Sequence, residues 1–197
     1  MSAARALSPW LRCHPRDPST EARRLKQLAG WCRQFTPLIS LQPPDALLLE
    51  IGASLRYFHG LEALCSRVED GIQRLGHEPL LAVAPTPTAA WLFARAREPA
   101  RLHNQAECND ALEALSVTAL PDDDSAAPEA LLALGCTTLG DCLALPREGL
   151  ARRFGHRLLR RLDRARGDHP DPRKPWQPDP RVTAPLSPCP WKRGRSR

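Results

Sequence analysis

The sequence predicts an α+β protein, in which a small sheet with covering helices is followed by an all-α unit built around a helix-hairpin-helix. Three observations support this prediction. Short apolar runs alternate with amphipathic stretches over residues 16–98, which is the order of a sheet packed against helices. Glycines bound a short turn over residues 135–140. A stretch dense in arginine follows from residue 146.

The first predicted elements are a helix and a β-hairpin. Asp17 or Ser19 can cap the helix, and Pro18 suits its first turn. Apolar residues continue at helical spacing to Phe35. Beyond Pro37, apolar runs at 38–42 and 46–51 flank a Pro-Pro-Asp turn, which predicts a hairpin.

The next predicted elements alternate helix and strand. An amphipathic helix covers 61–75 and ends at Gly76. The run PLLAVA at 79–84 predicts a buried strand, and Thr86 opens a further helix that reaches Arg97. We expect a domain boundary near residues 98–99.

The second half is predicted to be helical. Residues 104–120 are mostly helical in pattern, and an acidic linker covers 122–128. A short apolar helix from residue 131 then leads into the turn at 135–140, a short helix at 141–145 and the arginine-dense helix. Thr138 and Asp141 have the spacing of a capping box.

Composition limits the class of partner and the compartment. The net charge of the 197 residues is +6 and the pI is about 9.2, which favours an anionic partner such as nucleic acid. No apolar run approaches the ~20 residues of a membrane span, and the first residues have no signal-peptide core. We expect a cytoplasmic protein with no membrane partner.

The side chains that commonly carry chemistry are scattered. Seven cysteines form no C-x-x-C pair and no metal spacing with histidine, so we expect reduced thiols, with Cys32, Cys65 and Cys142 buried. The six histidines do not cluster with carboxylates or cysteines. Ser40 has no G-x-S-x-G setting, and the chain has no Gly-rich nucleotide loop. The sequence therefore predicts no metal, no cofactor and no nucleophilic hydrolase.

The predicted hairpin is the strongest candidate for a functional site. A turn of this kind directs successive backbone N–H groups at one phosphate, and the following helix adds its positive N-terminal end. The contacts would be independent of base sequence. The alternative is purely structural: the turn residues cap their helices and the arginines form a solvated face. The candidate DNA-binding residues are Gly135, Thr137, Thr138, Gly140, Arg147, Arg152, Arg153 and Arg157.

Three segments together resemble the Y-family translesion DNA polymerases, and among them the ImuB-like branch most closely. Residues 16–64 resemble the palm, 79–95 resemble its next strand and helix, and 134–167 resemble the thumb, with its R-R-F-G. The resemblance covers residues 10–178.

It implies an incomplete polymerase palm followed by a helix-hairpin-helix thumb. In these terms, 1–15 are a remnant of the fingers or a linker, 16–98 a partial palm and 99–168 the thumb. By its composition, 169–197 is a Pro/Arg-rich tail that we expect to be extended or disordered. We also expect a partial copy of the family.

The chain departs from the polymerases where catalysis would occur. Active members hold two Mg²⁺ ions with carboxylates, one from a strand that we expect upstream of Met1 and a pair within Ser-x-Asp-Glu of the hairpin. Here Gln42 and Pro43 follow Ser40 at the places of that pair, and neither supplies an anionic ligand. Asp45 is interpreted as a turn residue and Glu50 as a strand carboxylate outside the metal pair. No catalytic residue is expected.

The resemblance also implies a function. The ImuB-like branch is understood to lack polymerase activity and to act as an adaptor in damage-induced mutagenesis, with a separate error-prone polymerase and a RecA-like partner. We expect a non-catalytic homologue in DNA repair and translesion synthesis that holds the DNA backbone through its thumb. The alternatives are an active error-prone polymerase, a protein-only interaction module and a decayed fragment.

Overall fold

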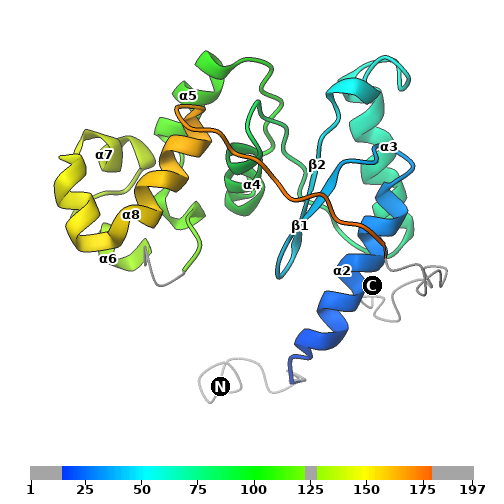
Figure 1. Ribbon diagram of the computed structural model, residues 1–197, viewed down its shortest axis with the longest axis horizontal. Helices are drawn as coiled ribbons and strands as arrows, with labels where there is room; N and C mark the ends of the chain where they lie inside the picture. The colour runs from blue at the N-terminus through cyan, green and yellow to red at the C-terminus, as the bar shows by residue number, and fades with distance from the viewer. Residues whose placement is uncertain (1–14, 123–127, 179–197) are drawn as a thin grey trace, which may run out of the picture.

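The structure is a computed structural model that describes residues 15–122 and 128–178. A β-hairpin with two helices forms one half, a group of helices that includes the long, kinked α8 forms the other, and α4 lies between them (Figure 1). The α+β fold class is confirmed. The elements are α2 (Pro18–Cys32), β1 (Ile39–Gln42), β2 (Ala46–Leu49), η1 (Gly52–Ser54), α3 (Leu61–Arg74), α4 (Pro87–Ala96), α5 (Gln105–Ala114), η2 (Val117–Ala119), α6 (Pro128–Leu132), α7 (Leu139–Ala144) and α8 (Arg147–Arg166).

Helix α2 is capped by Asp17, one of the two predicted capping residues. The Asp17 carboxylate accepts from the backbone N–H groups of Ser19 at 3.0 Å and Thr20 at 3.1 Å, which satisfies donors that the first turn of a helix leaves unpaired. The helix ends at Cys32, earlier than predicted, and residues 33–35 form a turn.

The hairpin of β1 and β2 confirms the predicted turn. The strands pair antiparallel with Ile39 opposite Leu49 and Gln42 opposite Ala46. Alternate side chains of β2 enter different clusters, as the strand period of two requires. Leu49 packs beside Ile39 on the α2 side, whereas Leu48 packs with the helices of the other half.

The predicted strand at 79–84 is not part of this sheet, and that prediction is wrong. Its one bridge is parallel, between Val83 and Arg101. The N–H of Val83 donates to the Ala100 oxygen at 2.8 Å, and Leu102 donates back to Val83 at 2.9 Å. Among the described residues no strand pairs with the side of this segment that faces β2, so no ladder forms.

The other helices follow their predicted positions closely. Helix α3 buries Leu64, Cys65 and Val68, and Gly76 follows it with a left-handed φ of 85°. Thr86 caps α4 by accepting from the Ala89 N–H at 3.2 Å. Helices α5 and η2 fill the stretch predicted to be mostly helical.

The largest core joins α4 to the helices that follow it. It also includes side chains of β2 and of 79–84 at its margin. The predicted domain boundary at 98–99 is not tested by this packing and stays a prediction. The side chains at most 2% exposed in this core include Leu92, Leu112, Leu131, Leu139 and Leu158.

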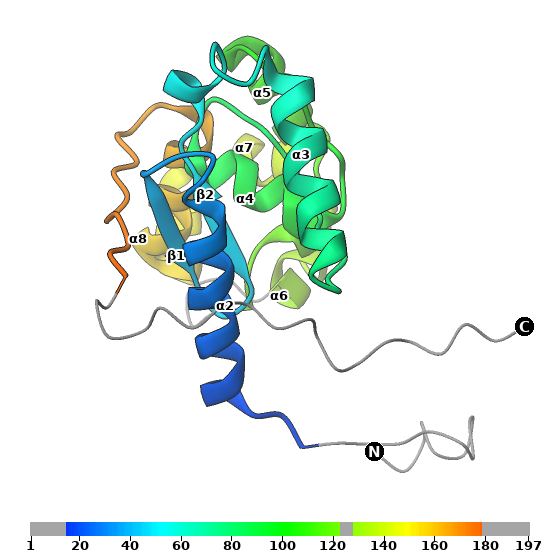
Figure 2. The same cartoon turned by 90° about the vertical axis from the view of Figure 1, so that its right-hand side faces the viewer.

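A C-terminal strap, residues 171–176, crosses from the end of α8 to the outer edge of β1 (Figures 1 and 2). The backbone N–H of Trp176 donates to the backbone oxygen of Ile39 at 2.7 Å, and the Ser40 hydroxyl donates to the backbone oxygen of Lys174 at 2.9 Å. Of the predicted extended or disordered tail, residues 171–176 are extended and bonded to the hairpin, and the part beyond residue 178 lies outside the described residues.

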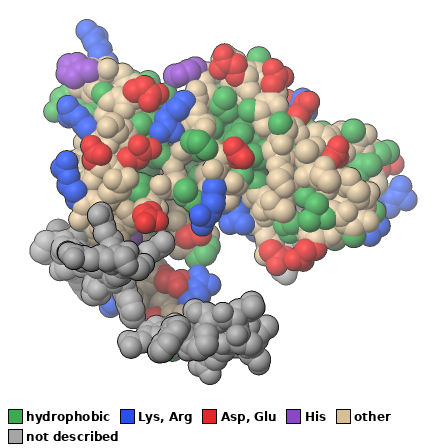
Figure 3. Space-filling model, turned by 180° about the vertical axis from the view of Figure 1, so that it is seen from behind, with side chains coloured by type: hydrophobic (Ala, Val, Ile, Leu, Met, Phe, Trp, Pro, Cys, Tyr) green, Lys and Arg blue, Asp and Glu red, His purple; other side chains and the backbone are tan. Residues whose placement is uncertain are grey.

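The surface opposite to that of Figure 1 is mixed in character. Hydrophobic side chains gather over the middle of this face, with acidic and basic ones scattered around them (Figure 3). In the described parts of the chain, no helix is long and apolar enough to cross a membrane.

Candidate nucleic-acid interface

The predicted capping box is present at the helix-hairpin-helix turn. The Thr138 hydroxyl accepts from the Asp141 N–H at 3.1 Å. The Asp141 carboxylate in turn accepts from the N–H groups of Thr138 and Thr137, each at 2.8 Å. These two backbone hydrogen bonds stabilise the carboxylate and lower the pKa of Asp141 to about 2. The local structural interpretation of this turn is therefore confirmed.

The same hydrogen bonds use donors that the phosphate-binding hypothesis requires. Besides the two threonine N–H groups, Cys136 donates to the Leu131 oxygen at 3.1 Å and Leu139 donates to the Leu115 oxygen at 2.8 Å. All four N–H groups of residues 136–139 thus have acceptors within the chain. The predicted backbone grip on a phosphate would require breaking these bonds.

The two glycines of the turn have different roles. Gly135 has a left-handed φ of 85°, which glycine adopts without steric cost. Gly140 lies within α7, where an added Cβ would stand 2.9 Å from the Glu113 oxygen. Gly140 therefore permits the close packing of α7 on α5, and the turn-forming role predicted for it is wrong.

Helix α8 carries the predicted arginines and is kinked at Gly155, whose φ is 73° and ψ 166°. Arg147 forms a two-pronged pair with Asp163, with nitrogen–oxygen distances of 2.9 and 2.8 Å. This hydrogen-bonded carboxylate raises the pKa of Arg147. Since the pair occupies both terminal nitrogens of the guanidinium, Arg147 braces the kinked helix.

Arg152 and Arg153 project from the first half of α8 and are exposed. The Arg153 guanidinium lies 5.9 Å from the centre of the Phe154 ring. Neither arginine forms an ion pair with another described residue. Both remain candidate contacts for an anion.

The structure gathers further arginines into one pocket where α8 and the strap meet the hairpin and α4. Its volume is about 390 Å³. Of the predicted site residues only Arg157 belongs to it. We call it the arginine pocket; its lining residues are Gln42, Thr88, Trp91, Arg157, Arg160, Arg161, Arg164 and Arg173.

One buried carboxylate organises the arginine pocket. The Asp171 side chain is 5% exposed and accepts from the Arg173 guanidinium at 3.0 Å. It also accepts from the N–H and the hydroxyl of Thr88, both at 2.8 Å, and Arg164 lies 4.0 Å from it. The pocket thus brings the side chains of five arginines together, and guanidinium groups of this kind suit an anion.

Part of this pocket carried a signal in the sequence. Residues 157, 160, 161 and 164 are spaced three and four apart, which places them on one face of a helix. That spacing was not used in the sequence analysis. Arg173 had no such signal, because its position depends on the strap returning to the hairpin.

The two hairpin residues predicted to stand in place of a carboxylate pair are an arginine-bound amide, Gln42, and a proline, Pro43. The Gln42 side-chain oxygen accepts from Arg173 at 3.0 Å, and Pro43 begins the turn. The nearby Glu50 carboxylate accepts from the N–H of Gly52 at 3.0 Å. Within residues 15–122 and 128–178, no three His, Cys, Asp or Glu side chains gather closely enough to hold a metal ion.

Two solved structures share this fold. One is a ternary complex of Dbh with partially disordered substrates, with a TM-score of 0.66. The other is DinB from Sulfolobus solfataricus, with a TM-score of 0.68. Each is 18% identical and covers 88% of this chain, which spans 53% and 52% of those chains respectively. The fold is that of part of a Y-family polymerase.

Two curated relatives match most of this chain. The ImuB proteins of Caulobacter vibrioides strains NA1000 / CB15N and ATCC 19089 / CIP 103742 / CB 15 are each 34% identical over 164 residues. The match covers 83% of this chain and 36% of each ImuB protein. The chain is thus similar to the ImuB proteins over most of its own length, and it spans about a third of the length of these relatives. No family model matches it.

Proposed function

We propose that this chain is a non-catalytic ImuB-like protein of damage-induced mutagenesis that binds the DNA backbone and acts as an adaptor. The observation that carries the proposal is the arginine pocket, whose described lining includes five arginines. Arginine is the side chain best matched to phosphate, since its planar fork donates two hydrogen bonds at once.

The DNA contacts involve phosphate rather than base edges. The arginine pocket would hold one backbone phosphate, and the exposed Arg152 and Arg153 would meet neighbouring phosphates along α8. The capped turn at 135–140 supports α8 as a rigid neighbour. Such contacts fix the position of the protein on the duplex without reading its sequence.

The absence of polymerase activity follows from the charge at the hairpin. A two-metal reaction needs anionic ligands around both cations. At Gln42 an arginine guanidinium already occupies the amide oxygen, and its charge repels Mg²⁺ from the position where a ligand would be needed. This chemistry supports a binding role over the alternative of an active error-prone polymerase.

The adaptor role is supported by the identity to ImuB over most of the chain. In this role the chain would join DNA to an error-prone polymerase and a RecA-like protein. The alternative is a protein-only interaction module. A pull-down of either partner that persists unchanged after nuclease treatment favours the alternative.

Binding of a fluorescent duplex across a salt titration tests the DNA-binding step. We expect log K to fall linearly with log salt, by about 0.9 for each phosphate neutralised. The double variant Arg157→Ala/Arg160→Ala should reduce that slope by about 1, since the pocket holds one phosphate and each phosphate contact accounts for about 1. The control is Arg33→Ala/Arg74→Ala, because both of its arginines are exposed in the half of the molecule formed by α2 and α3.

Two results would overturn the proposal. Duplex binding that does not respond to salt, or that both double variants weaken equally, would rule out the arginine pocket as the phosphate site. Primer extension by the purified wild-type chain in Mg²⁺ would rule out the non-catalytic role.

A further inference from the structure

One N–H group at the start of α4 is bonded to a carboxylate from the strap. The N–H groups of Ala89 and Ala90 donate to the hydroxyl and the backbone oxygen of Thr86, at 3.2 and 3.1 Å. The Thr88 N–H donates instead to the Asp171 carboxylate, at 2.8 Å. The first turn of a helix favours an anion at this position, and here the strap supplies that anion.

The donors that hold this carboxylate are those of a phosphate site. One oxygen of Asp171 accepts from the N–H and the hydroxyl of Thr88, each at 2.8 Å, and from the Arg173 guanidinium at 3.0 Å. Proteins hold DNA phosphates with arginine, with threonine hydroxyls and with the N–H groups of helix N-termini. The Asp171 carboxylate therefore occupies a set of donors that suits a phosphate oxygen.

The carboxylate leaves other donors of the arginine pocket without an acceptor. Its second oxygen lies 4.0 Å from Nε of Arg164, which is beyond hydrogen-bonding distance. Nε of Arg173 and the indole Nε1 of Trp91 are buried, and neither donates to a described residue. Buried polar groups are rarely left unpaired. Because these groups are all donors, a ligand of the pocket has to bring acceptor oxygens.

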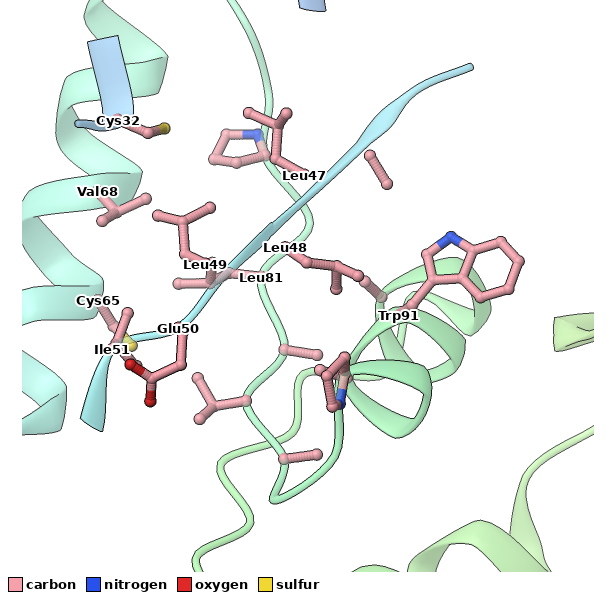
Figure 4. Close-up of a pocket in the computed structure, with 18 of the residues that line it drawn as sticks. Cys32, Leu47, Leu48, Leu49, Glu50, Ile51, Cys65, Val68, Leu81 and Trp91 are labelled. Carbon is pink, nitrogen blue, oxygen red and sulfur yellow. The ribbon is translucent and has the colours of Figure 1, made fainter. Parts of the chain in front are cut away.

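Trp91 carries one of these donors on the side of α4 that lines the arginine pocket. Figure 4 shows its indole extending from α4 away from Leu48 of β2. The residue is 8% exposed, and the Arg161 guanidinium lies 5.9 Å from the centre of its ring. An anion between α8 and the strap would therefore lie beside the indole.

We propose that Asp171 holds the place of a phosphate, and that a DNA backbone phosphate displaces its carboxylate from the start of α4. This exchange rests on the proposed function, because the phosphate is the one that the arginine pocket binds. Thr88 and Arg173 become its direct contacts. A phosphate is larger than a carboxylate and carries four oxygens, so it can approach Arg164 while it bonds to Thr88. Asp171 is then an autoinhibitory group.

The burial of these side chains makes the displacement necessary. Thr88 is 3% exposed and the Asp171 side chain 5%, so a phosphate reaches Thr88 only when the carboxylate moves out. The strap can stay on the hairpin meanwhile, because the bond from Trp176 to Ile39 does not involve Asp171. An intramolecular competitor of this kind weakens the apparent affinity, since only the fraction of molecules with an open site can bind.

Duplex binding by Asp171→Ala tests the competition. Without the carboxylate the site is open in every molecule, so the duplex should bind at least ~threefold tighter than it binds the wild type at the same salt concentration. The control is Asp168→Ala, which removes the same charge from an exposed carboxylate of the same segment that pairs with Arg166 at 3.2 Å. The control should change the affinity by less than ~twofold.

Hydrogen exchange of the Thr88 amide tests where the phosphate binds. In Asp171→Ala this amide loses its acceptor and should exchange at least ~tenfold faster than in the wild type. Saturating duplex should restore slow exchange, because a phosphate oxygen takes the place of the carboxylate. The Trp176 amide, which bonds to Ile39, should stay protected in the variant with and without duplex.

Duplex binding by Asp171→Ala that is no tighter than that of Asp168→Ala would overturn the proposal, because Asp171 would then only position Arg173. So would a Thr88 amide that saturating duplex leaves in fast exchange. The isosteric Asp171→Asn, compared with Asp168→Asn, repeats the binding test without opening a space in the fold. If duplex binding responds to salt and to Arg157→Ala/Arg160→Ala while these tests fail, the proposed function stands and only the displacement of Asp171 is wrong.

Discussion

The guanidinium of Arg173 donates to the side-chain oxygen of Gln42 at 3.0 Å, joining residues 131 apart in the sequence. The same guanidinium donates to the Thr88 hydroxyl at 2.7 Å and to Asp171 at 3.0 Å. The hairpin, α4 and the strap therefore meet at one side chain, and the shape of the arginine pocket depends on it.

Replacing Arg173 should lower both the stability of the folded protein and the salt dependence of its duplex binding. We expect Arg173→Ala to reduce the free energy of unfolding by about 1–3 kcal/mol, since buried partners lose their donor. The salt slope of duplex binding should also fall by about 1. Urea denaturation and the salt titration measure the two effects. Arg173→Lys, which keeps the charge without the fork, should retain more of the salt slope than of the stability.

The capping box predicts that the folded protein loses stability at low pH. The pKa of Asp141 is lowered to about 2 from an ordinary 3.8. The stability that its carboxylate adds to the folded state is therefore complete above pH 4 and is lost as the pH falls toward 2. The melting temperature of the wild type should therefore fall more steeply between pH 4 and 2 than that of Asp141→Asn. Thermal melts across this range measure the difference, and parallel curves for the two proteins would contradict it.

Two glycines of α8 should respond oppositely to alanine. Gly155 has φ 73° and ψ 166°, a region that is essentially restricted to glycine, so Gly155→Ala should cost about 1–3 kcal/mol. Gly149 is helical and an added Cβ meets no atom within 4 Å, so Gly149→Ala should stabilise by up to ~1 kcal/mol. Denaturation curves provide the comparison. Equal effects at both positions would show that the kink is not a feature of the folded protein.

The buried thiols predict resistance to alkylation. Burial raises the pKa of Cys32 and of Cys142 to about 12 and that of Cys108 to about 11, and the thiolate is the reactive form. At pH 8 the native protein should leave these three cysteines unmodified, and urea should expose all of them. Mass spectrometry of the labelled peptides distinguishes the sites. Rapid native labelling at Cys32 would contradict the packing of α2 on the hairpin.

Local sequence signals predicted much of this fold because the forces behind them are local. Asp17 caps α2 through N–H groups two and three residues away, and the Pro-Pro-Asp turn forms the hairpin between adjacent runs. The capping box at Thr138 and Asp141 is equally short in range. Each of these features was predicted at its observed position.

The features that the sequence did not predict depend on partners far away in the sequence. An apolar run such as 79–84 matches a strand by composition, but a strand also needs a neighbour with a matching edge. The strap is rich in proline, which indicates disorder by composition alone. Its order comes from Thr88, Ser40 and Ile39, far away in sequence. The arginine pocket was therefore only partly predictable, since Arg173 belongs to that segment.

The strap also affects the order in which the molecule is completed during synthesis. The Ser40 hydroxyl bonds to the Lys174 carbonyl, 134 residues later. At ribosomal rates of ~5–20 residues per second, roughly 7–27 s separate the emergence of these two groups. Throughout that interval the outer edge of β1 lacks its cover, and exposed strand edges are templates for aggregation. Until Lys174 emerges, the nascent hairpin therefore carries a strand edge that is open to mispairing.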